Sequence, residues 1–306
     1  RVLGDAKSER DGGGRRMVAR SGSFLRFAVS ALCGFAGSDR HLRDDRADEL
    51  MNRRCVAQVV LADGADPKDA EEVAQALVSA SEELGAVRAS HASVHYDFAV
   101  GGGDLTWDLF LESEATVGVP ASSLGAALLG VMNGDRLGEL LPSSLGSLAN
   151  RVERVEFAQP ELIASGTNAP GLVGVKRTLW MRVNPAAPPD LVARFEAESP
   201  ILADGIPAIR NWRWSRIPQR DFGEEGEGRT VGSNTESGAA LRWTHLWEQE
   251  FETVDGLQID YMSSPVHWGF IDRYFDPEMP DCIIDPWLAH LACPETAPVL
   301  SWDLDR

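Results

Sequence analysis

The same order of predicted secondary structure recurs twice along this chain of 306 residues, and this repeat limits the folds that the chain can adopt. In the first half, β-branched runs predict strands over residues 55–61, 87–98 and 105–111. Asp66-Pro67 predicts the start of a helix that runs to about residue 84. Small apolar residues at 120–132 predict a second helix, and residues 152–157 predict a fourth strand.

The second half repeats this order from about residue 171. Strands are predicted over residues 173–183, 208–217 and 240–251, and Pro188-Pro189-Asp190 predicts the start of a helix after the first strand. Each half is therefore β-α-β-β-α-β or a close variant, the ferredoxin-like order of an α+β fold. A four-stranded sheet of this kind has helices on one face and a bare apolar face on the other. The alternative is that the halves are unrelated neighbours, since this order is common.

The remaining segments set the predicted domain boundaries. Residues 1–50 are predicted to be a flexible leader, because Arg1 to Arg20 is rich in Gly, Arg and Asp without an apolar period. An export signal over residues 17–37 is the alternative, although Arg26 interrupts it. The repeats are predicted over 51–160 and 171–276, with a Gly/Glu-rich loop at 220–238 inside the second. Residues 277–306 contain many prolines and no clear period, which predicts an extended C-terminal tail.

Charge and composition exclude several classes of partner. The formal net charge of −18 argues against binding to nucleic acid or to an anionic membrane, which need a basic surface. No apolar run approaches the roughly 20 residues that span a bilayer. The four cysteines are scattered and fit reduced thiols, which favours a cytoplasmic protein. His91 and His95 lie on one face of a predicted strand, but no third ligand has suitable spacing, so we predict no metal site.

The segment from Asp260 to Phe270 carries the residues best suited to chemistry. Ser264 followed by Pro265 predicts a helix start, so Tyr261 closes one short helix and His267 lies in the first turn of the next. A tyrosine hydroxyl and an imidazole can donate and accept protons near neutral pH. The alternative is that both rings fill core space at a helix elbow.

This segment resembles the Tyr-x-x-x-Pro-x-His motif of the stress-responsive dimeric α/β-barrel (Dabb) family. The resemblance spans about residues 174–276 and includes Val175-Lys176-Arg177, Ile206-Pro207-Ala208-Ile209 and Thr244-His245. Members of this family pair two sheets into a barrel with the helices outside. The resemblance therefore implies that the two ferredoxin-like repeats pair into an internal α/β barrel.

In polyketide cyclases of this family, the matching Tyr and His are the catalytic pair, which implies that Tyr261 and His267 are catalytic here. This sequence departs from the cyclases at three positions. Ser264 stands where many members have a second His, Arg177 replaces a first-strand His, and Ser199 replaces a pocket Tyr. The departures leave the substrate open.

The candidate substrate-binding residues surround this pair in the second repeat; they are His245, Arg177, Trp243, Trp247 and Phe270. His245 alternates with the two tryptophans, so we expect all three side chains to face the barrel lumen. Arg177 is suited to hold a carboxylate or enolate through a forked pair. The alternatives are a core histidine at 245 and a surface ion pair at Arg177. The first repeat has Leu109 near the place of His245, so we expect it to act as a closing wall.

These residues predict a lyase or cyclase that acts on a small aromatic or polyketide-like molecule by acid/base catalysis without a cofactor. His267 is expected to be the base, Tyr261 to orient it or to donate to the substrate oxygen, and Arg177 or His245 to stabilise the enolate. One alternative is a non-catalytic, stress-associated ligand-binding barrel, in which His267 is tied to a backbone carbonyl. Another is a cofactor-independent monooxygenase. The expected partner is a small organic ligand, and further oligomerisation of the internal pseudo-dimer stays open.

Overall fold

The computed structural model describes residues 54–83, 87–111, 151–158, 160–168, 171–218 and 243–301. All of them lie in one compact unit, Asp45–Arg306. The predictions for the leader at residues 1–50, the helix at 120–132 and the loop at 220–238 lie outside the described residues. No helix in the described ranges is long and apolar enough to cross a membrane.

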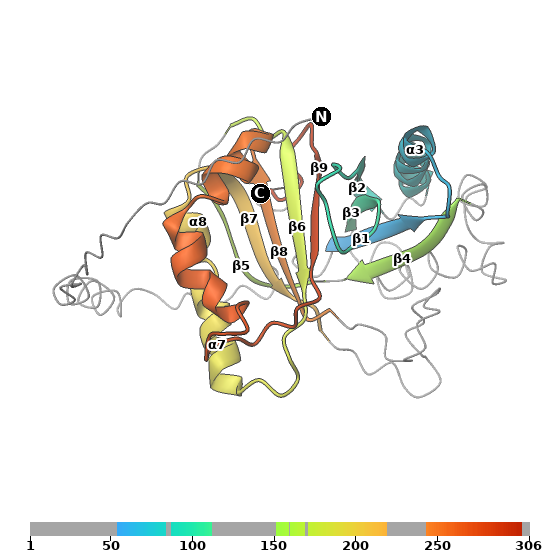
Figure 1. Cartoon of the computed structure of the whole chain (residues 1–306). Helices are drawn as coiled ribbons and strands as arrows, with labels where there is room; N and C mark the ends of the chain where they lie inside the picture. The colour runs from blue at the N-terminus through green and yellow to red at the C-terminus, as the bar shows by residue number, and fades with distance from the viewer. Residues whose placement is uncertain are drawn as a thin grey trace, which may run out of the picture. The chain divides into compact units, whose positions relative to one another are not determined.

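The first repeat forms a four-stranded antiparallel sheet, sheet A, with the strand order β2-β3-β1-β4 (Figure 1). Its strands are β1 (Arg54–Leu61), β2 (Val87–Val94), β3 (Leu105–Leu111) and β4 (Val152–Ala158). Helix α3 (Pro67–Glu83) connects the first two strands, as predicted. This strand order is that of the ferredoxin-like fold, and the sequence prediction located all four strands, although β2 ends at Val94 and not at residue 98.

Alternation along β1 divides its side chains between two environments. Ala57 and Val59 pack with Val73 and Leu77 of helix α3 in one buried cluster. Arg54 and Gln58, which are also buried, point to the opposite face. The second face of sheet A is therefore partly polar, and not the bare apolar face that the sequence led us to expect.

The second repeat forms sheet B, with the order β5-β7-β8-β6-β9. Its strands are β5 (Glu161–Thr167), β6 (Val175–Met181), β7 (Ile209–Arg216), β8 (His245–Phe251) and β9 (Ala289–Pro294). Its helical segments are α7 (Pro189–Glu198), α8 (Ile201–Gly205), η2 (Gly256–Tyr261), η3 (His267–Ile271) and η4 (Asp272–Tyr274). Without β5, the order of sheet B is the same ferredoxin-like order as that of sheet A.

Two strands of sheet B differ from the sequence prediction. Strand β9 lies within residues 277–306, where an extended tail was expected, and it pairs antiparallel with β6 from Val175↔Pro294 to Trp180↔Ala289. Strand β5 adds an edge beside β7 that was not predicted. Both segments contain small residues and weak β-formers, so pairing with a neighbouring strand, and not local propensity, decides their conformation.

Contacts between the repeats join the inner faces of the two sheets. The Arg54 guanidinium binds the Glu248 carboxylate at 2.6 Å, and the Lys176 ammonium binds the Asp108 carboxylate at 2.6 Å. An apolar cluster also combines both repeats; it consists of Val56, Ala158, Trp180, Leu246, Ala289 and Leu291. The chain is thus an α+β protein in which two ferredoxin-like repeats pair into an internal α/β barrel.

A loop of the first repeat also bonds to the last strand of the second. The Tyr96 amide donates to the Ala292 carbonyl at 2.8 Å, and Val100 and His290 form an isolated antiparallel bridge. The next residue, Gly101, has φ of 80°, and a Cβ there would lie 2.0 Å from the Leu288 carbonyl oxygen. Glycine is needed at this position because the loop touches the backbone that leads into β9.

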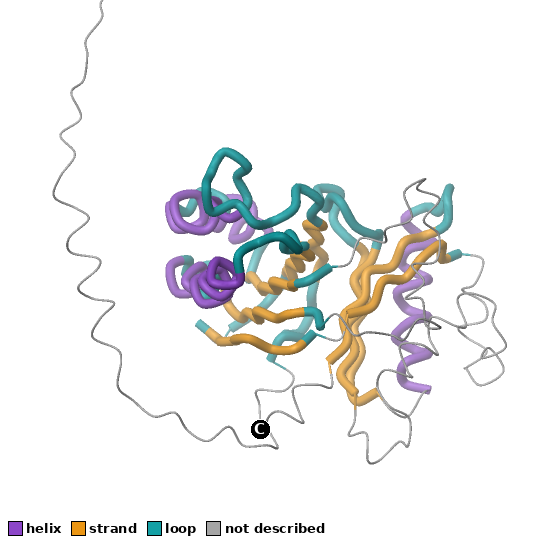
Figure 2. Tube along the Cα trace, turned by 90° about the horizontal axis from the view of Figure 1, so that it is seen from below, coloured by secondary structure: helices purple, strands orange, loops and turns teal. Residues whose placement is uncertain are grey.

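Helices cover the other face of each sheet (Figure 2). On sheet B, this side buries a large apolar cluster that includes Phe195 of α7, Leu202 of α8, Trp214 of β7, Trp247 of β8 and Tyr261 of η2. The cluster contains the residues that frame the candidate site.

Candidate functional site

The elbow between η2 and η3 forms as the sequence predicts. The helical turn begins at Pro265, and the Ser264 hydroxyl accepts a hydrogen bond from the Val266 amide at 3.3 Å. Proline at the first helical position ends the preceding turn and begins the next. The elbow brings the rings of Tyr261 and His267 together, with centroids 4.7 Å apart and planes inclined by 54°.

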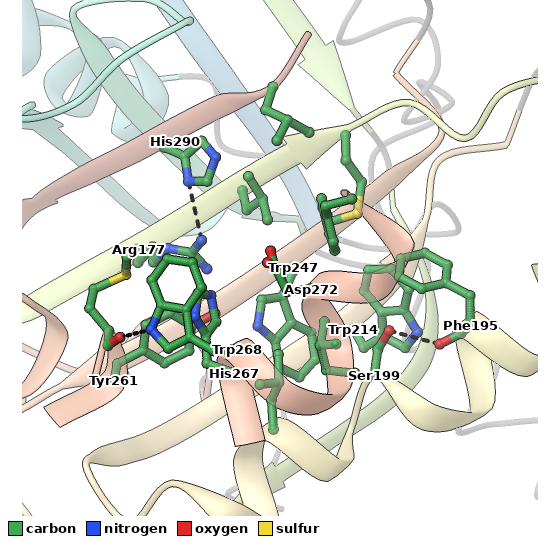
Figure 3. A pocket seen from close by; sticks show the side chains of 17 residues that line it. Arg177, Phe195, Ser199, Trp214, Trp247, Tyr261, His267, Trp268, Asp272 and His290 are labelled. Atoms are coloured by element: carbon green, nitrogen blue, oxygen red, sulfur yellow. Dashed lines mark hydrogen bonds between the residues drawn. The ribbon is translucent and has the colours of Figure 1, made fainter. Parts of the chain in front are cut away.

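These two rings line a cavity of about 210 Å³ between sheet B and its helices (Figure 3). The cavity therefore lies on the helix-covered side of the sheet, and not in the barrel lumen where it was expected. The described lining residues are Arg177, Leu179, Met181, Phe195, Ser199, Leu202, Trp214, Trp247, Tyr261, Met262, His267, Trp268, Ile271, Asp272, Phe275, Leu288 and His290.

One end of the cavity is polar and is organised around Arg177 (Figure 3). This residue is 5% exposed, and its guanidinium lies over the Tyr261 ring at 5.0 Å from the ring centroid. Its Nη1 donates to Oε1 of Gln249 at 2.7 Å, and its Nη2 lies 3.3 Å from Nδ1 of His290. Because Arg can only donate, Nδ1 of His290 must be the unprotonated acceptor. Arg177 is thus a buried cation held by neutral groups.

Burial and Arg177 keep the ionisable rings of this end uncharged. Burial, followed by the charge of Arg177, lowers the pKa of both His267 and His290 to about 4. Burial raises the pKa of the Tyr261 hydroxyl, and the nearby Arg177 and Gln249 side chains offset this only in part. At neutral pH the two imidazoles are therefore neutral bases, and the tyrosine is a protonated donor.

Two polar atoms in the lining have no hydrogen-bond partner among the described residues. They are Nδ1 of His267 and Nε1 of Trp247. Buried polar atoms usually have a partner, and an orphan beside a cavity is a candidate contact for a ligand. His267 is therefore not tied to a backbone carbonyl through Nδ1, as the non-catalytic alternative required.

The opposite end of the cavity is aromatic. Phe195 meets Trp214 edge to face at 5.2 Å between centroids, and Trp214 meets Trp247 in the same way at 5.6 Å. The Ser199 hydroxyl lies at this end and donates to the Phe195 carbonyl at 2.7 Å. Trp268 lies at the Arg177 end, with its ring centroid 5.0 Å from that of His267 (Figure 3). It is 54% exposed, and its indole N–H donates to the Met262 carbonyl. The cavity thus combines an apolar body with a single cationic end.

Four of the predicted site residues line this cavity, namely Tyr261, His267, Arg177 and Trp247. The other three do not. His245 stacks on Trp214, and its ring nitrogens lie 3.0 Å from Glu196 and from Thr244, so it is a satisfied core histidine.

Trp243 and Phe270 also lie away from the cavity. Trp243 packs on Trp180 at 6.2 Å between centroids, and its indole N–H donates to Glu156 at 2.8 Å. It precedes β8 and joins the cluster between the sheets, so the alternation that grouped it with His245 was wrong. Phe270 lies beneath the Arg273 guanidinium, 4.8 Å from the ring centroid.

His290 is the polar residue that sequence reasoning missed. It lies in β9, a strand that local propensity did not reveal, and only its pairing with β6 brings it to Arg177. His95, which we considered as a metal ligand, bonds instead to the Gly103 carbonyl at 2.7 Å and to Thr106 at 2.8 Å. No group of three His, Cys, Asp or Glu side chains among the described residues is suited to hold a metal ion.

No protein-family model matches this chain, and no curated protein matches it. Among solved structures it is similar to an anthrone oxidase-like protein, at 9% identity and a TM-score of 0.49, over 79% of this chain and 91% of that one. A variant of chlorite dismutase from Candidatus Nitrospira defluvii aligns at 9% identity and a TM-score of 0.41, over 86% and 98%. A dimeric ferredoxin-like protein of unknown function from Thermobifida fusca aligns with 42% of this chain at 17% identity and a TM-score of 0.26, over 92% of its own length. The fold and the site themselves define a tandem α/β-barrel protein with a small cavity in its second repeat.

Proposed function

We propose that the cavity of the second repeat binds a small aromatic or polyketide-like carbonyl compound and removes a proton next to the carbonyl without a cofactor. This is lyase or cyclase chemistry of the kind found in the stress-responsive barrel family that the Tyr261/His267 segment resembles. The observation that carries the proposal is that Tyr261, His267 and Arg177 meet at one end of a single cavity of about 210 Å³.

The size and lining of the cavity favour a substrate with one aromatic ring. An engineered protein cavity of about 150 Å³ lined by apolar side chains is known to hold benzene. The cavity here is larger, at about 210 Å³, and Trp214, Trp247 and Phe195 supply aromatic walls. A substituted single ring, with its carbonyl directed toward Arg177, fits both observations.

The three residues divide the work of proton transfer. His267 is neutral and its Nδ1 has no partner in the described structure, so it can accept the proton. Tyr261 stays protonated and can donate to the carbonyl oxygen, where negative charge develops. A base whose pKa is about 4 is weak, so the reaction depends on Arg177 to stabilise the enolate.

Hydrogen–deuterium exchange of the acetophenone methyl group in D₂O, followed by NMR, tests this proposal. The protein should accelerate the exchange, and Tyr261→Phe or His267→Ala should lower the acceleration by roughly 10²- to 10⁴-fold while the thermal unfolding midpoint is retained. His95→Asn, in the first repeat, is the matched control and should exchange like the unsubstituted protein.

Each alternative gives a distinct result in the same experiment. Acetophenone that binds but exchanges at the buffer rate would leave a non-catalytic binding protein. Consumption of dioxygen by the protein with a reactive phenolic substrate would indicate a monooxygenase. Unchanged exchange in both variants would contradict the roles given to Tyr261 and His267.

A further inference from the structure

Arg177 is the starting point, because a buried cation without an acid is uncommon in a folded protein. Removing a guanidinium from water is costly unless a counter-charge compensates it. No carboxylate among the described residues lies within ion-pair distance of Arg177, and its hydrogen-bond partners are the uncharged Gln249 and His290. Asp272 is the only acid among the described lining residues, and it forms no ion pair with Arg177.

Two other buried cations, Arg54 and Lys176, are neutralised by carboxylates. Arg54 binds both Asp108 and Glu248 at 2.6 Å, and Lys176 binds the same two carboxylates at 2.6 and 3.1 Å. Burial alone therefore does not account for an unpaired guanidinium in this protein. Arg177 differs from Arg54 and Lys176 in that it lines a cavity.

Further donors surround the guanidinium. Nε1 of Trp247 is a pure donor in the cavity wall and has no partner among the described residues, and the Tyr261 hydroxyl in the same lining is protonated. Gln249 is fully buried, and its Oε1 is already used by Arg177. An anion with two acceptor oxygens would use donors of this kind and would supply the missing negative charge.

His290 holds the guanidinium from the opposite side. Its Nδ1 accepts from Nη2 of Arg177 (Figure 3). Gln249 accepts from Nη1, so the two acceptors fix both arms of the fork. The two partners come from strands β9 and β8, which flank the strand that carries Arg177. Both strands of the sheet that neighbour β6 therefore contribute to the orientation of this one side chain.

We propose that Arg177 is an anion-recognition group, that the natural ligand of the cavity is a monoanion with a small aromatic body, and that His290 is the residue that positions Arg177. The chemical class is an aromatic carboxylate, which supplies two acceptor oxygens. This inference shares its cavity with the proposed function and rests on it only in taking that cavity as the binding site. It adds to the proposed function that the ligand carries a negative charge before any reaction, and that strand β9 supplies the residue that positions Arg177.

Binding of benzoate and of benzamide, its neutral analogue of the same shape, tests the charge of the ligand. Isothermal titration of the full chain should give a dissociation constant for benzoate roughly 10- to 100-fold lower than for benzamide. Arg177→Met should abolish this preference. Arg210→Met is the matched control, because Arg210 pairs with Glu252 outside the cavity, and it should keep the preference.

His290 is tested by two substitutions of similar size. His290→Leu removes the acceptor and should lower the preference for benzoate by roughly threefold to tenfold. His290→Asn keeps an acceptor oxygen near the position of Nδ1 and should restore most of it. A residue that only fills space would give the opposite order, since leucine packs better than asparagine in an apolar site, and an unchanged preference in His290→Leu would remove the positioning role.

Three results would overturn the anion site. They are equal binding of benzoate and benzamide, a preference that survives Arg177→Met, and no binding of either probe at millimolar concentration. The same titration in His267→Ala separates this inference from the proposed function. If that variant keeps both its preference for benzoate and its exchange of acetophenone, the acid/base proposal fails and the anion site stands. If exchange is lost in that variant but the unsubstituted protein shows no preference, the anion site fails alone.

Discussion

Lys176 and Arg177 are neighbours on one strand, both are buried cations, and their surroundings are opposite in character. The Lys176 side chain points between the sheets, where Arg54, Asp108 and Glu248 complete a group of two cations and two anions. The Arg177 side chain points to the helix side and meets only neutral acceptors. Two consecutive residues therefore serve different purposes: the neutralised Lys176 belongs to a structural ion cluster, and the unpaired Arg177 belongs to a candidate binding site.

The balanced cluster follows the symmetry of the repeat. Each repeat contributes a cation from its first strand, Arg54 or Lys176, and an acid from its third strand, Asp108 or Glu248. Each cation contacts both acids, so the four side chains tie the two sheets in one register. The cavity has no such symmetry: Cys55 follows Arg54 as Arg177 follows Lys176, and both Cys55 and Leu109 belong to the helix-facing apolar cluster of the first repeat.

The largest effect is expected from Lys176→Met, which would break the balanced cluster. Asp108 and Glu248 would then share Arg54, leaving one buried negative charge without a partner. The free energy of unfolding should fall by about 3–5 kcal/mol, as measured by urea denaturation. Glu252→Gln is the control: it removes an exposed partner of Arg210 and should change stability by about 0.5 kcal/mol or less. If Lys176→Met lowers the free energy of unfolding by no more than Glu252→Gln does, the ion cluster does not hold the sheets together.

An intermediate effect on the free energy of unfolding is expected when the pH is lowered. It tests His290, the cavity residue that holds Arg177. The pKa of His290 is lowered from 6.5 to about 4 in the folded protein. As the pH falls, the unfolded chain therefore binds a proton at this residue near pH 6.5, whereas the folded protein binds it only near pH 4. The resulting stability is complete above about pH 6.5 and is lost as the pH falls toward 4. Over this range the contribution of His290 is on the order of 2 kcal/mol.

His290→Asn removes this titrating group while keeping an acceptor for Arg177. The free energy of unfolding measured at several pH values should therefore fall less steeply between pH 6.5 and 4 in this variant. His95→Asn should reduce the slope in the same way, since burial lowers the pKa of His95 to about 4 as well, but it should leave benzoate binding unchanged. An unaltered slope in His290→Asn would mean that this imidazole titrates normally in the folded protein.

The smallest effect on stability is expected from Arg177→Met, one residue from the most damaging substitution. The change removes an uncompensated buried charge, which is favourable, but it leaves Oε1 of Gln249 and Nδ1 of His290 without a donor. These terms oppose each other, so the free energy of unfolding should change by about 1 kcal/mol or less. A loss of the size expected for Lys176→Met would mean that Arg177 is structural, and the comparison would no longer identify a binding site.

The sequence predicted the elements whose local signals and burial agree. β-branched and aromatic content located β1, β3 and β8. Ser264-Pro265 located the elbow that joins Tyr261 to His267, because capping and proline chemistry act over a few residues. Alternation could not tell which face of sheet B holds the cavity, since both faces are buried. For that reason the lumen was chosen wrongly, and Trp243 was assigned to the wrong side.

What the sequence could not supply were contacts that depend on distant strands. His290 reaches Arg177 only because β9 pairs with β6, and the run Ala289 to Pro294 has little strand propensity of its own. The pairing of Arg54 with Glu248 depends on two strands almost two hundred residues apart. Each repeat has a cation in its first predicted strand and an acid in its third, and this pattern is visible in the sequence. Pairing the cations of one repeat with the acids of the other would have predicted the ion cluster.

The position of β9 has a consequence for the order of folding. This strand joins β6 more than a hundred residues after β6 has been made, and it also receives backbone hydrogen bonds from the loop after β2. Such distant contacts form late in folding, because closing a long loop costs conformational entropy before any hydrogen bonds between the strands form. A ribosome-bound chain that has not yet exposed residue 294 would hold Tyr261 and His267 at their elbow but lack the wall that orients Arg177. The candidate site would therefore be completed only after β9 has been made, when the sheets themselves have already begun to assemble.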